Sequence, residues 1–341
     1  MRMFWRDFSR CCSKEKYFDI TASKKTMKVS IVIPNYNYAR FIPATIDSIM
    51  AQSYKDVEVV VVDDGSTDNS REVIANLQQK FPKLIKTIFQ SNQGQGSAMN
   101  AGFYAATGDI VAFLDADDIW KPDKLQRVVD IFKTTDVIGV MHHLDVVDAD
   151  GNVVGTTQGP ELDDDLASLI VETGNAWHFP PTSGLTFRRN TLKKVFPLLW
   201  TEWPDGFMIY SAAFLGKIRT LAETLGSYRN HGANNHAGLA MTCDREAKML
   251  AGTELTNQYI NSFLERIDYP KRVDLSRNLQ YRRTKYYRCG KWNIGEARAI
   301  ASLIITWKYY SSKEKVYFLG RFILKNLQFL FRSNSYIEAS S

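Results

Sequence analysis

The sequence predicts an α/β fold, in which helices flank a mostly parallel central sheet, followed by an all-α C-terminal extension. Between residues 29 and 132, apolar segments typical of buried strands alternate with segments of helical periodicity. This alternation requires right-handed crossover connections, which place successive strands parallel to one another. A chain of 341 residues with 45% apolar composition can bury such a core and leave room for a second unit.

Four strands are predicted in the first half of the chain, and each runs into a helical segment. The strands are Val29–Pro34, Val57–Val62, Leu84–Phe89 and Ile110–Asp115. The helix after the first strand has Ile42, Ile46 and Ile49 on one face, and Ser97–Ala106 is a helix of small residues. The helix after Pro122 has apolar residues at i, i+3, i+4 and i+7 from Leu125.

The second half begins with a strand at Val137–Val147, which Asp150-Gly151 turns into a hairpin with Asn152–Gly155. Asp163–Glu172 and Phe207–Leu215 are predicted helices. From about residue 240 the chain has helical periodicity only, in segments 244–268, 275–289, 293–309 and 313–332. We therefore divide the chain into a basic N-terminal extension (1–27), a catalytic domain (28–239) and a helical extension (240–341).

Three carboxylates, Asp115, Asp117 and Asp118, lie in four positions directly after the fourth strand. Because side chains alternate along an extended chain, Asp115 and Asp117 are expected to point the same way. Neighbouring carboxylates repel each other unless a cation lies between them, and oxygen ligands at a strand end suit Mg²⁺ or Mn²⁺. The alternative is a solvated acidic turn. Ligands of parallel sheets bind beyond the carboxyl ends of the strands, so Tyr36 and Asp64 are expected in the same crevice.

Four sequence blocks resemble the family 2 glycosyltransferases with the GT-A fold. They are KVSIVIPNYN (28–37), VVVVDDGSTDNS (59–70), NQGQGSAMNAG (92–102) and ATGDIVAFLDADD (106–118), and their order and spacing match the family. In the last block, Asp115-Ala116-Asp117 resembles the DxD motif. The resemblance covers roughly residues 28–235. It implies inverting, metal-dependent transfer of a sugar from a nucleotide-diphosphate donor, a UDP-sugar, to an acceptor hydroxyl.

The resemblance also implies a role for individual residues of the donor site. Asp64 accepts the imide proton of the base while Asp63 shapes the turn, unless both cap the following helix. Tyr36 stacks near the base, unless it is only a packed strand residue. The residues implied to bind the donor nucleotide are Pro34, Tyr36, Asp63, Asp64, Asn92, Gly94, Asp115 and Ala116.

A bound Mn²⁺ or Mg²⁺ is implied at Asp117, with Asp115 nearer the ribose or completing the metal shell. His231, in the block Tyr228–Gly232, is implied to complete the metal or diphosphate site, and a purely structural histidine is the alternative. Asp118 is expected to cap the helix at Pro122.

Asp205 matches the catalytic base of the family, just before an apolar helix. Helix capping is its alternative role, and Glu202 is a competing base because Pro204 replaces the glutamate that usually precedes this aspartate. Met99 stands where many family members have arginine, so the resemblance implies no cationic contact to the diphosphate from this helix. Glycines that permit close helix–sheet packing explain the Gly94 loop equally well.

The composition restricts which binding partners and which cellular compartment are expected for the protein. The net charge of +6 suits anionic partners such as sugar nucleotides or acidic lipid surfaces. The four cysteines, Cys11, Cys12, Cys243 and Cys289, show neither ligand spacing nor a disulfide framework, which favours a reducing cytoplasm. No run of 18 apolar residues exists. The resemblance implies a saccharide or polyprenyl-linked saccharide acceptor, bacterial surface polysaccharide biosynthesis, a location on the inner face of the membrane, and no nucleic-acid partner.

The last predicted helix leaves two interpretations open. One stripe is apolar (Val316, Leu319, Ile323, Leu327 and Leu330), and three cations lie on the opposite side (Arg321, Lys325 and Arg332). This pattern is typical of an interfacial helix on an anionic membrane and also of a helix that packs on the protein with a solvated basic face.

Two other functions are compatible with parts of the pattern. A nucleotidyltransferase shares the crossovers and acidic motifs, but it needs a basic glycine-rich loop after the first strand, where this chain has PNYNYARF. A non-catalytic subunit that binds sugar nucleotides or a partner protein is the other alternative, and the intact Asp117 and Asp205 argue against it.

Overall fold

The computed structural model describes residues 26–148, 150–157, 165–176, 179–199, 203–231, 242–289, 292–308 and 310–338, with side chains up to residue 327 in the last helix. Almost all of the predicted basic extension, the competing base Glu202 and the side chains of Leu330 and Arg332 lie outside these described parts.

A mixed sheet of nine strands forms the centre of the molecule, with the order β3-β2-β1-β4-β8-β6-β9-β5 and with β7 paired to β6. The strands are β1 (Val29–Asn35), β2 (Val57–Asp64), β3 (Ile85–Gln90), β4 (Ile110–Phe113), β5 (Ile119–Trp120), β6 (Gly139–Val147), β7 (Val153–Thr156), β8 (Leu185–Arg188) and β9 (Ile218–Arg229). The strands β3, β2, β1 and β4 are parallel, as predicted. Beyond β4 the sheet is mixed, because β8 runs antiparallel to both of its neighbours.

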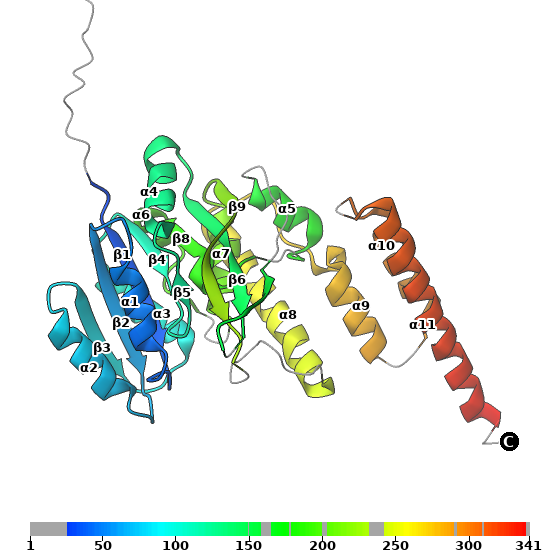
Figure 1. The fold of residues 1–341 in the computed structure, drawn as a ribbon. Helices are drawn as coiled ribbons and strands as arrows, with labels where there is room; N and C mark the ends of the chain where they lie inside the picture. The colour runs from blue at the N-terminus through cyan, green and yellow to red at the C-terminus, as the bar shows by residue number, and fades with distance from the viewer. Residues whose placement is uncertain are drawn as a thin grey trace, which may run out of the picture.

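Helices cover both faces of the sheet (Figure 1). They are α1 (Ile42–Met50), α2 (Ser70–Lys80), α3 (Gln95–Ala105), α4 (Lys124–Thr134), α5 (Leu166–Thr173), α6 (Arg189–Leu192), α7 (Pro204–Ala213), α8 (Cys243–Arg266), α9 (Leu279–Arg288), α10 (Ile294–Thr306) and α11 (Ser312–Glu338). The apolar residues of α1, α2 and α4 share one buried cluster with β1, β2 and β4. Those of α3, α5, α7 and α8 form another cluster with the opposite side chains of β1 and β4.

Close contact between α3 and the sheet depends on Gly102. A Cβ atom at this position would lie 2.3 Å from Cγ1 of Val32, a fully buried residue of β1. The glycine therefore lets the helix backbone approach the strand closely.

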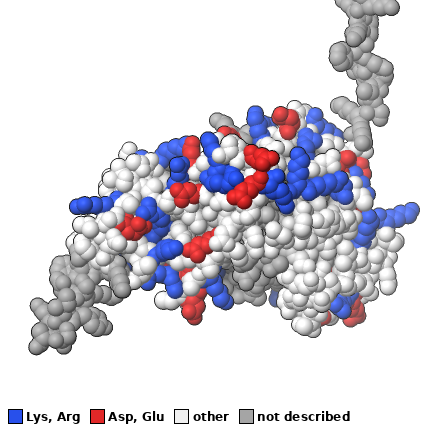
Figure 2. All heavy atoms as spheres, turned by 180° about the vertical axis from the view of Figure 1, so that it is seen from behind, with Lys and Arg blue, Asp and Glu red and all other residues white. Residues whose placement is uncertain are grey.

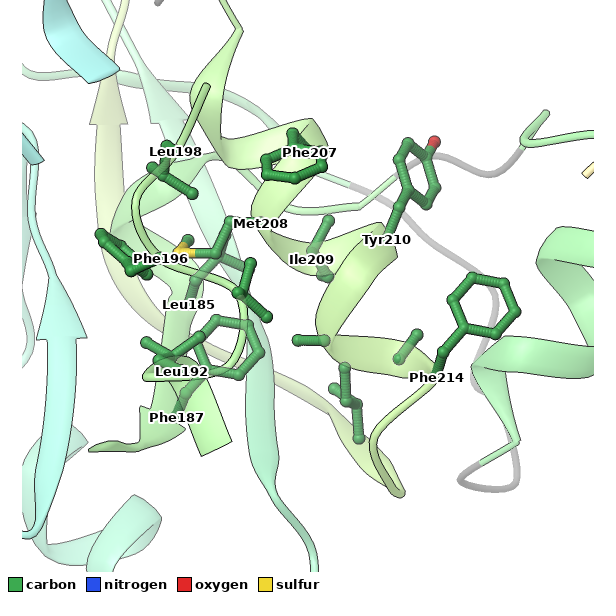
Figure 3. Packing of buried hydrophobic residues seen from close by; sticks show 14 of the residues in the cluster. Leu185, Phe187, Leu192, Phe196, Leu198, Phe207, Met208, Ile209, Tyr210 and Phe214 are labelled. Atoms are coloured by element: carbon green, nitrogen blue, oxygen red, sulfur yellow. The ribbon is translucent and has the colours of Figure 1, made fainter. Parts of the chain in front are cut away.

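The helix α7 is buried on all sides. Of residues 204–213, every one except Asp205 is buried. Figure 3 shows Leu185, Phe187, Leu192, Phe196 and Leu198 on one side of this helix, with Tyr210 and Phe214 directed to the other side. An apolar helix held in this way fixes the position of its single accessible side chain.

The C-terminal helices divide between two clusters. Ile260, Phe263 and Leu264 of α8 belong to the same core as α7. The helices α9, α10 and α11 form a smaller cluster of their own around Tyr286, Ile300 and Phe322. These three helices stand at the side of the molecule opposite β3 (Figure 1).

One side of α11 packs on α9 and α10, and another carries exposed apolar residues. Phe322 is buried, and Asn326 accepts a hydrogen bond from the hydroxyl of Tyr286 (2.6 Å). Val316 and Leu324 are 73% and 63% exposed. Within the described residues, no helix is long and apolar enough to cross a membrane. Seen from behind, basic and acidic side chains are interspersed on these helices, and a broad area without charges lies in the lower part of the half with the N-terminal strands, below a band of charged residues (Figure 2).

Candidate active site

The acidic segment is a turn that links β4 to β5. The strand β4 ends at Phe113, two residues before the predicted end at Asp115, because the chain bends to reach β5. In the sheet order, β5 lies four places from β4, although only residues 114–118 connect the two strands. The sheet must therefore curve so that β5 returns towards the end of β4, and the acidic turn connects these two strands.

Asp118 does not cap the following helix, so this prediction is wrong. Its carboxylate is fully buried, accepts a hydrogen bond from the hydroxyl of Ser183 (2.5 Å) and accepts another from the backbone N–H of Arg229 (3.0 Å). The N-cap residue of α4 is Asp123. Burial, followed by the charge of Asp117, holds the pKa of Asp118 well above its usual range. Asp118 joins the acidic turn to β9 and to the segment before β8.

Asp117 and His231 form a pair. The Oδ2 atom of Asp117 lies 3.0 Å from Nε2 of His231, and the guanidinium of Arg229 donates to the backbone carbonyl of Asp117 (3.0 Å). The imidazole of His231 stacks on the ring of Phe41, with a centroid separation of 4.6 Å. Burial raises the pKa of Asp117, and the hydrogen bond with His231 opposes this rise.

Asp115 is held by hydrogen bonds with Gln95 and Ser183. Its Oδ1 atom accepts a hydrogen bond from the side-chain amide of Gln95 (3.0 Å), and its backbone N–H donates to Ser183. Burial, followed by the charges of Asp118, Asp117 and Asp205, raises the pKa of Asp115 well above its usual range. The charges of the other three carboxylates therefore act on Asp115.

Asp205 lies in the first turn of α7. Its Oδ2 atom is 3.5 Å from the hydroxyl of Thr182, and the N-cap position of this helix belongs to Trp203. Burial raises the pKa of Tyr210, and the charge of Asp205 adds to that rise. The charge of Asp205 therefore acts on both Asp115 and Tyr210.

Asp63 and Asp64 end β2, and neither accepts a hydrogen bond from a backbone amide of α2, whose N-cap residue is Asn69. Asp63 organises the turn, since its carboxylate accepts from the side chains of Asn35 (2.9 Å) and Ser66 (2.5 Å). Asp64 accepts from the backbone amides of Gln93 (3.0 Å) and Gly94 (2.8 Å).

The loop before α3 connects the two acidic groups. The N–H of Gly94 donates to Asp64, and the side chain of the next residue, Gln95, donates to Asp115. Gly94 has φ of +88°, a conformation that favours glycine, and it is the N-cap residue of α3. A single short loop thus sets the distance between the ends of β2 and β4.

The other residues expected to bind the nucleotide lie at the same edge of the sheet. Tyr36 follows β1 and is 43% exposed, so it is not the packed residue of the alternative interpretation. Pro34 pairs with Val62 near the end of β1. The backbone of Asn92 lies against Gly65, and the carbonyl of the buried Ala116 accepts from Thr45 (2.8 Å).

Sequence reasoning missed three residues that organise the site. Ser183 bridges Asp115 and Asp118, Gln95 binds Asp115, and Phe41 supports His231. Each is a common residue type in a segment without a charge pattern, so only the fold shows its role.

Within the described residues, no group of three or more His, Cys, Asp or Glu side chains is arranged as a complete metal site. Asp117 and His231 nevertheless offer a carboxylate oxygen and an imidazole nitrogen 3.0 Å apart, a donor pair that Mn²⁺ accepts. Two protein ligands leave positions for water and phosphate oxygens. The residues present therefore fit a divalent ion that is shared with a phosphorylated ligand.

Comparisons with known proteins agree with this geometry. A model of glycosyl transferase family 2 matches residues 30–196. An uncharacterized glycosyltransferase of Nostoc sp. is 58% identical over 321 residues, which cover 92% of this chain and 100% of that protein. The amylovoran biosynthesis glycosyltransferase AmsB of Erwinia amylovora is 40% identical over 105 residues, 30% of this chain and 35% of that protein.

Similarity also extends to a solved structure. The crystal structure of Staphylococcus aureus TarS 1–349 in complex with UDP-GlcNAc superimposes with a TM-score of 0.54 at 19% identity, over 92% of each chain. This similarity confirms the predicted GT-A-like fold. The 58% identity to the whole length of a glycosyltransferase confirms the family that the four sequence blocks predicted. The chain is a sugar-transferring enzyme and belongs to glycosyl transferase family 2.

Proposed function

We propose that this glycosyltransferase moves a sugar from a nucleotide-diphosphate donor, a UDP-sugar, to a hydroxyl of a saccharide acceptor with inversion. The observation that carries the proposal is the convergence of Asp115, the Asp117–His231 pair and Asp205 at one edge of the sheet. Residues 28–239 supply these groups, and α8 from the helical extension packs on the same core. The names of relatives such as AmsB support a role in surface polysaccharide biosynthesis.

The donor nucleotide binds at the ends of β1 and β2. Tyr36 is exposed there and can stack on the base. The Oδ1 atom of Asp64 already accepts from the side-chain amide of Gln90 and the backbone N–H of Gln93. The Oδ2 atom accepts from the N–H of Gly94, and its second lone pair would receive the imide N–H of uracil. Asp63 keeps the turn in shape, and Pro34, Asn92, Gly94 and Ala116 supply the surrounding walls.

The diphosphate lies over the acidic turn. Asp117 and His231 would hold Mn²⁺ or Mg²⁺, with Asp115 towards the ribose. When bound, such an ion neutralises negative charge that builds on the departing diphosphate. The hydrogen bonds of Arg229 and Ser183 fix the turn, so the ligands need little rearrangement.

Asp205 acts as the general base. Its carboxylate takes the proton of the acceptor hydroxyl while that oxygen forms a bond to the anomeric carbon and the bond to the diphosphate oxygen breaks. Attack from the side opposite the leaving group inverts the anomeric carbon. Asp205 suits this role because it is the one accessible residue of a buried helix and lies near Asp115.

The test of this proposal measures UDP binding by calorimetry with and without Mn²⁺. Wild-type protein should bind UDP more tightly with Mn²⁺, and Asp117→Ala should bind UDP equally in both conditions and lose nearly all transfer. Asp123→Ala is the matched control, because Asp123 is exposed and its side chain makes no capping hydrogen bond. Equal UDP affinity with and without Mn²⁺ in the wild type would exclude the metal.

A further inference from the structure

A cavity of about 340 Å³ lies between α7, α8 and α9, next to the proposed base. Gly206, which follows Asp205, is part of its wall, and so is Tyr210, on which the charge of Asp205 acts. The indole of Trp203, another wall residue, lies directly on the backbone of α8, because a Cβ atom at Gly252 would be 1.7 Å from Cζ3 of this ring. The helical extension therefore completes a cavity that begins on the helix of the base.

The lining of this cavity is suited to an uncharged sugar ring. Aromatic side chains, such as Phe179 and Tyr281, can cover the apolar C–H face of a sugar. The amides of Asn175 and Gln280 can exchange hydrogen bonds with hydroxyl groups. Among the described lining residues Glu246 is the only charged one, so a carboxylate or phosphate on this ring would find no cation to pair with.

A second cleft, of about 620 Å³, continues from the cavity along α8 and α9, since Glu246 and Thr284 line both spaces. The residues of α8 that line them include Cys243, Glu246, Leu250, Thr253 and Thr256. Their spacing of i, i+3, i+7, i+10 and i+13 places them on one side of the helix. This side of α8 rises about 20 Å at 1.5 Å per residue, which is longer than a single sugar ring. The two spaces therefore form one groove.

The second cleft is basic, and the cations that line it are Arg283 and Arg288 from α9 and Arg321 and Lys325 from α11. Among the described residues, none of the four lies within 4.0 Å of a carboxylate oxygen. Their contacts are with uncharged groups. Arg288 donates to the backbone carbonyl of Cys243 and Arg321 to the hydroxyl of Tyr317, and the ammonium of Lys325 lies 3.8 Å from the ring centre of Tyr287. The one acidic lining residue is Glu246, at the boundary with the cavity.

We propose that the groove binds an anionic oligosaccharide as the acceptor, with its uncharged terminal ring in the cavity beside Asp205 and its carboxylate or phosphate groups in the basic cleft. Carboxylate and phosphate present the same chemistry to arginine, because both offer two oxygens that accept parallel N–H bonds. Glu246 disfavours an acidic group on the terminal ring. The inference rests on the proposed function and adds to it the charge of the acceptor and the position of that charge.

The test measures binding of oligosaccharides in pairs that differ only in charge, by calorimetry at low ionic strength. An unsulfated chondroitin tetrasaccharide, which carries glucuronate units, is paired with its carboxyl-reduced form. Maltotriose phosphorylated on its reducing-end ring is paired with maltotriose. EDTA is present, so that no divalent ion binds the charged probes at the donor site. Wild-type protein should bind the charged member of at least one pair at least tenfold more tightly than the neutral member.

Variants of the groove separate the contribution of charge from that of the aromatic cavity. Arg283→Gln/Lys325→Gln should bind both members of a pair alike. Lys313→Gln, which removes an exposed cation of α11 outside the cleft, is the matched control and should keep the wild-type preference. Trp203→Ala should weaken both members of a pair equally, because it removes an aromatic face and no charge.

Thermal denaturation shows which variants fold, and Arg321→Gln replaces the double variant if that protein does not. The inference is overturned if the wild type prefers the charged member of neither pair, or if its preference persists in the folded cleft variants. Inorganic phosphate that binds as tightly as phosphorylated maltotriose would overturn the saccharide part.

UDP binding with Mn²⁺, measured on the same wild-type protein, separates the two proposals. UDP binding without a preference for charged oligosaccharides overturns this inference alone, and the reverse result overturns the donor site alone.

Discussion

The carboxylates of the site differ in the groups that stabilise them. Asp118 has two hydrogen-bond donors and is enclosed, which makes it a structural residue. Asp117 has an imidazole within hydrogen-bond distance, and Asp115 has one side-chain amide. The sequence placed these three residues in one turn, but its prediction that Asp118 caps the next helix is wrong, because hydrogen-bond donors from distant segments, Ser183 and Arg229, bind this carboxylate.

Asp205→Asn separates a general base from a helix-capping residue. An amide cannot accept the acceptor proton, so we expect turnover to fall by ~10²–10⁴-fold while UDP binding is retained. Steady-state transfer rates, normalised to folded protein, measure the effect. If the variant loses thermal stability and keeps its turnover, Asp205 supports the helix N-terminus and has no catalytic role.

At the scale of single elements, the parallel strands were predictable and β9 was not. Strands such as β2, in which seven of eight residues are buried, have a nearly uninterrupted apolar segment in their sequence. The strand β9 is only partly buried, contains Glu223 and Thr224, and gives no clear period. This strand nevertheless carries Arg229 to the acidic turn. The part of the site that comes from β9 was visible only as the motif around His231.

Two glycine substitutions test how closely α3 approaches the sheet. Gly102→Ala should lower the free energy of unfolding by ~1–3 kcal/mol, because the new methyl group would lie 2.3 Å from Cγ1 of the fully buried Val32. Gly320→Ala, in α11, is the control: nothing lies within 4 Å of its Cβ position, and the gain in helix propensity should stabilise it by up to ~1 kcal/mol.

Urea denaturation of both variants gives the comparison. A Gly102→Ala protein as stable as the wild type would mean that α3 can move away from β1 without cost, and that Gly102 has no packing role.

For the molecule as a whole, a polar group inside the sheet sets part of the pH dependence of stability. His142 is fully buried, its Nδ1 atom lies 2.9 Å from the carbonyl of His143, and it is near the buried Lys124. Burial, followed by the charge of Lys124, lowers the pKa of His142 to about 3. Between pH 6.5 and 3 the unfolded chain therefore binds more protons than the folded one, and stability falls as the pH falls.

His142→Leu should reduce this acid sensitivity. Its free energy of unfolding should decrease less than that of the wild type between pH 7.5 and pH 5, because leucine binds no proton in either state. The pH range avoids the titration of Glu58. Burial raises the pKa of Glu58, but hydrogen bonds from Lys28 and Ser30 lower this pKa by more, so the folded-state pKa is below the usual value of about 4.5. The ionised Glu58 therefore stabilises the fold above that usual pKa. Parallel pH profiles of the two proteins would show that His142 does not contribute.

The acidic turn has a consequence for the order in which the chain folds. Its partners are remote in sequence: Ser183 is 65 residues beyond Asp118, and His231 is 114 residues beyond Asp117. Contacts of such long range form slowly, since a large loop must close before they stabilise anything. The four parallel strands can assemble from neighbouring segments, whereas the turn receives its support from Ser183 and His231 only when the segment before β8 and the end of β9 arrive. During refolding, the recovery of donor binding should therefore follow the recovery of secondary structure.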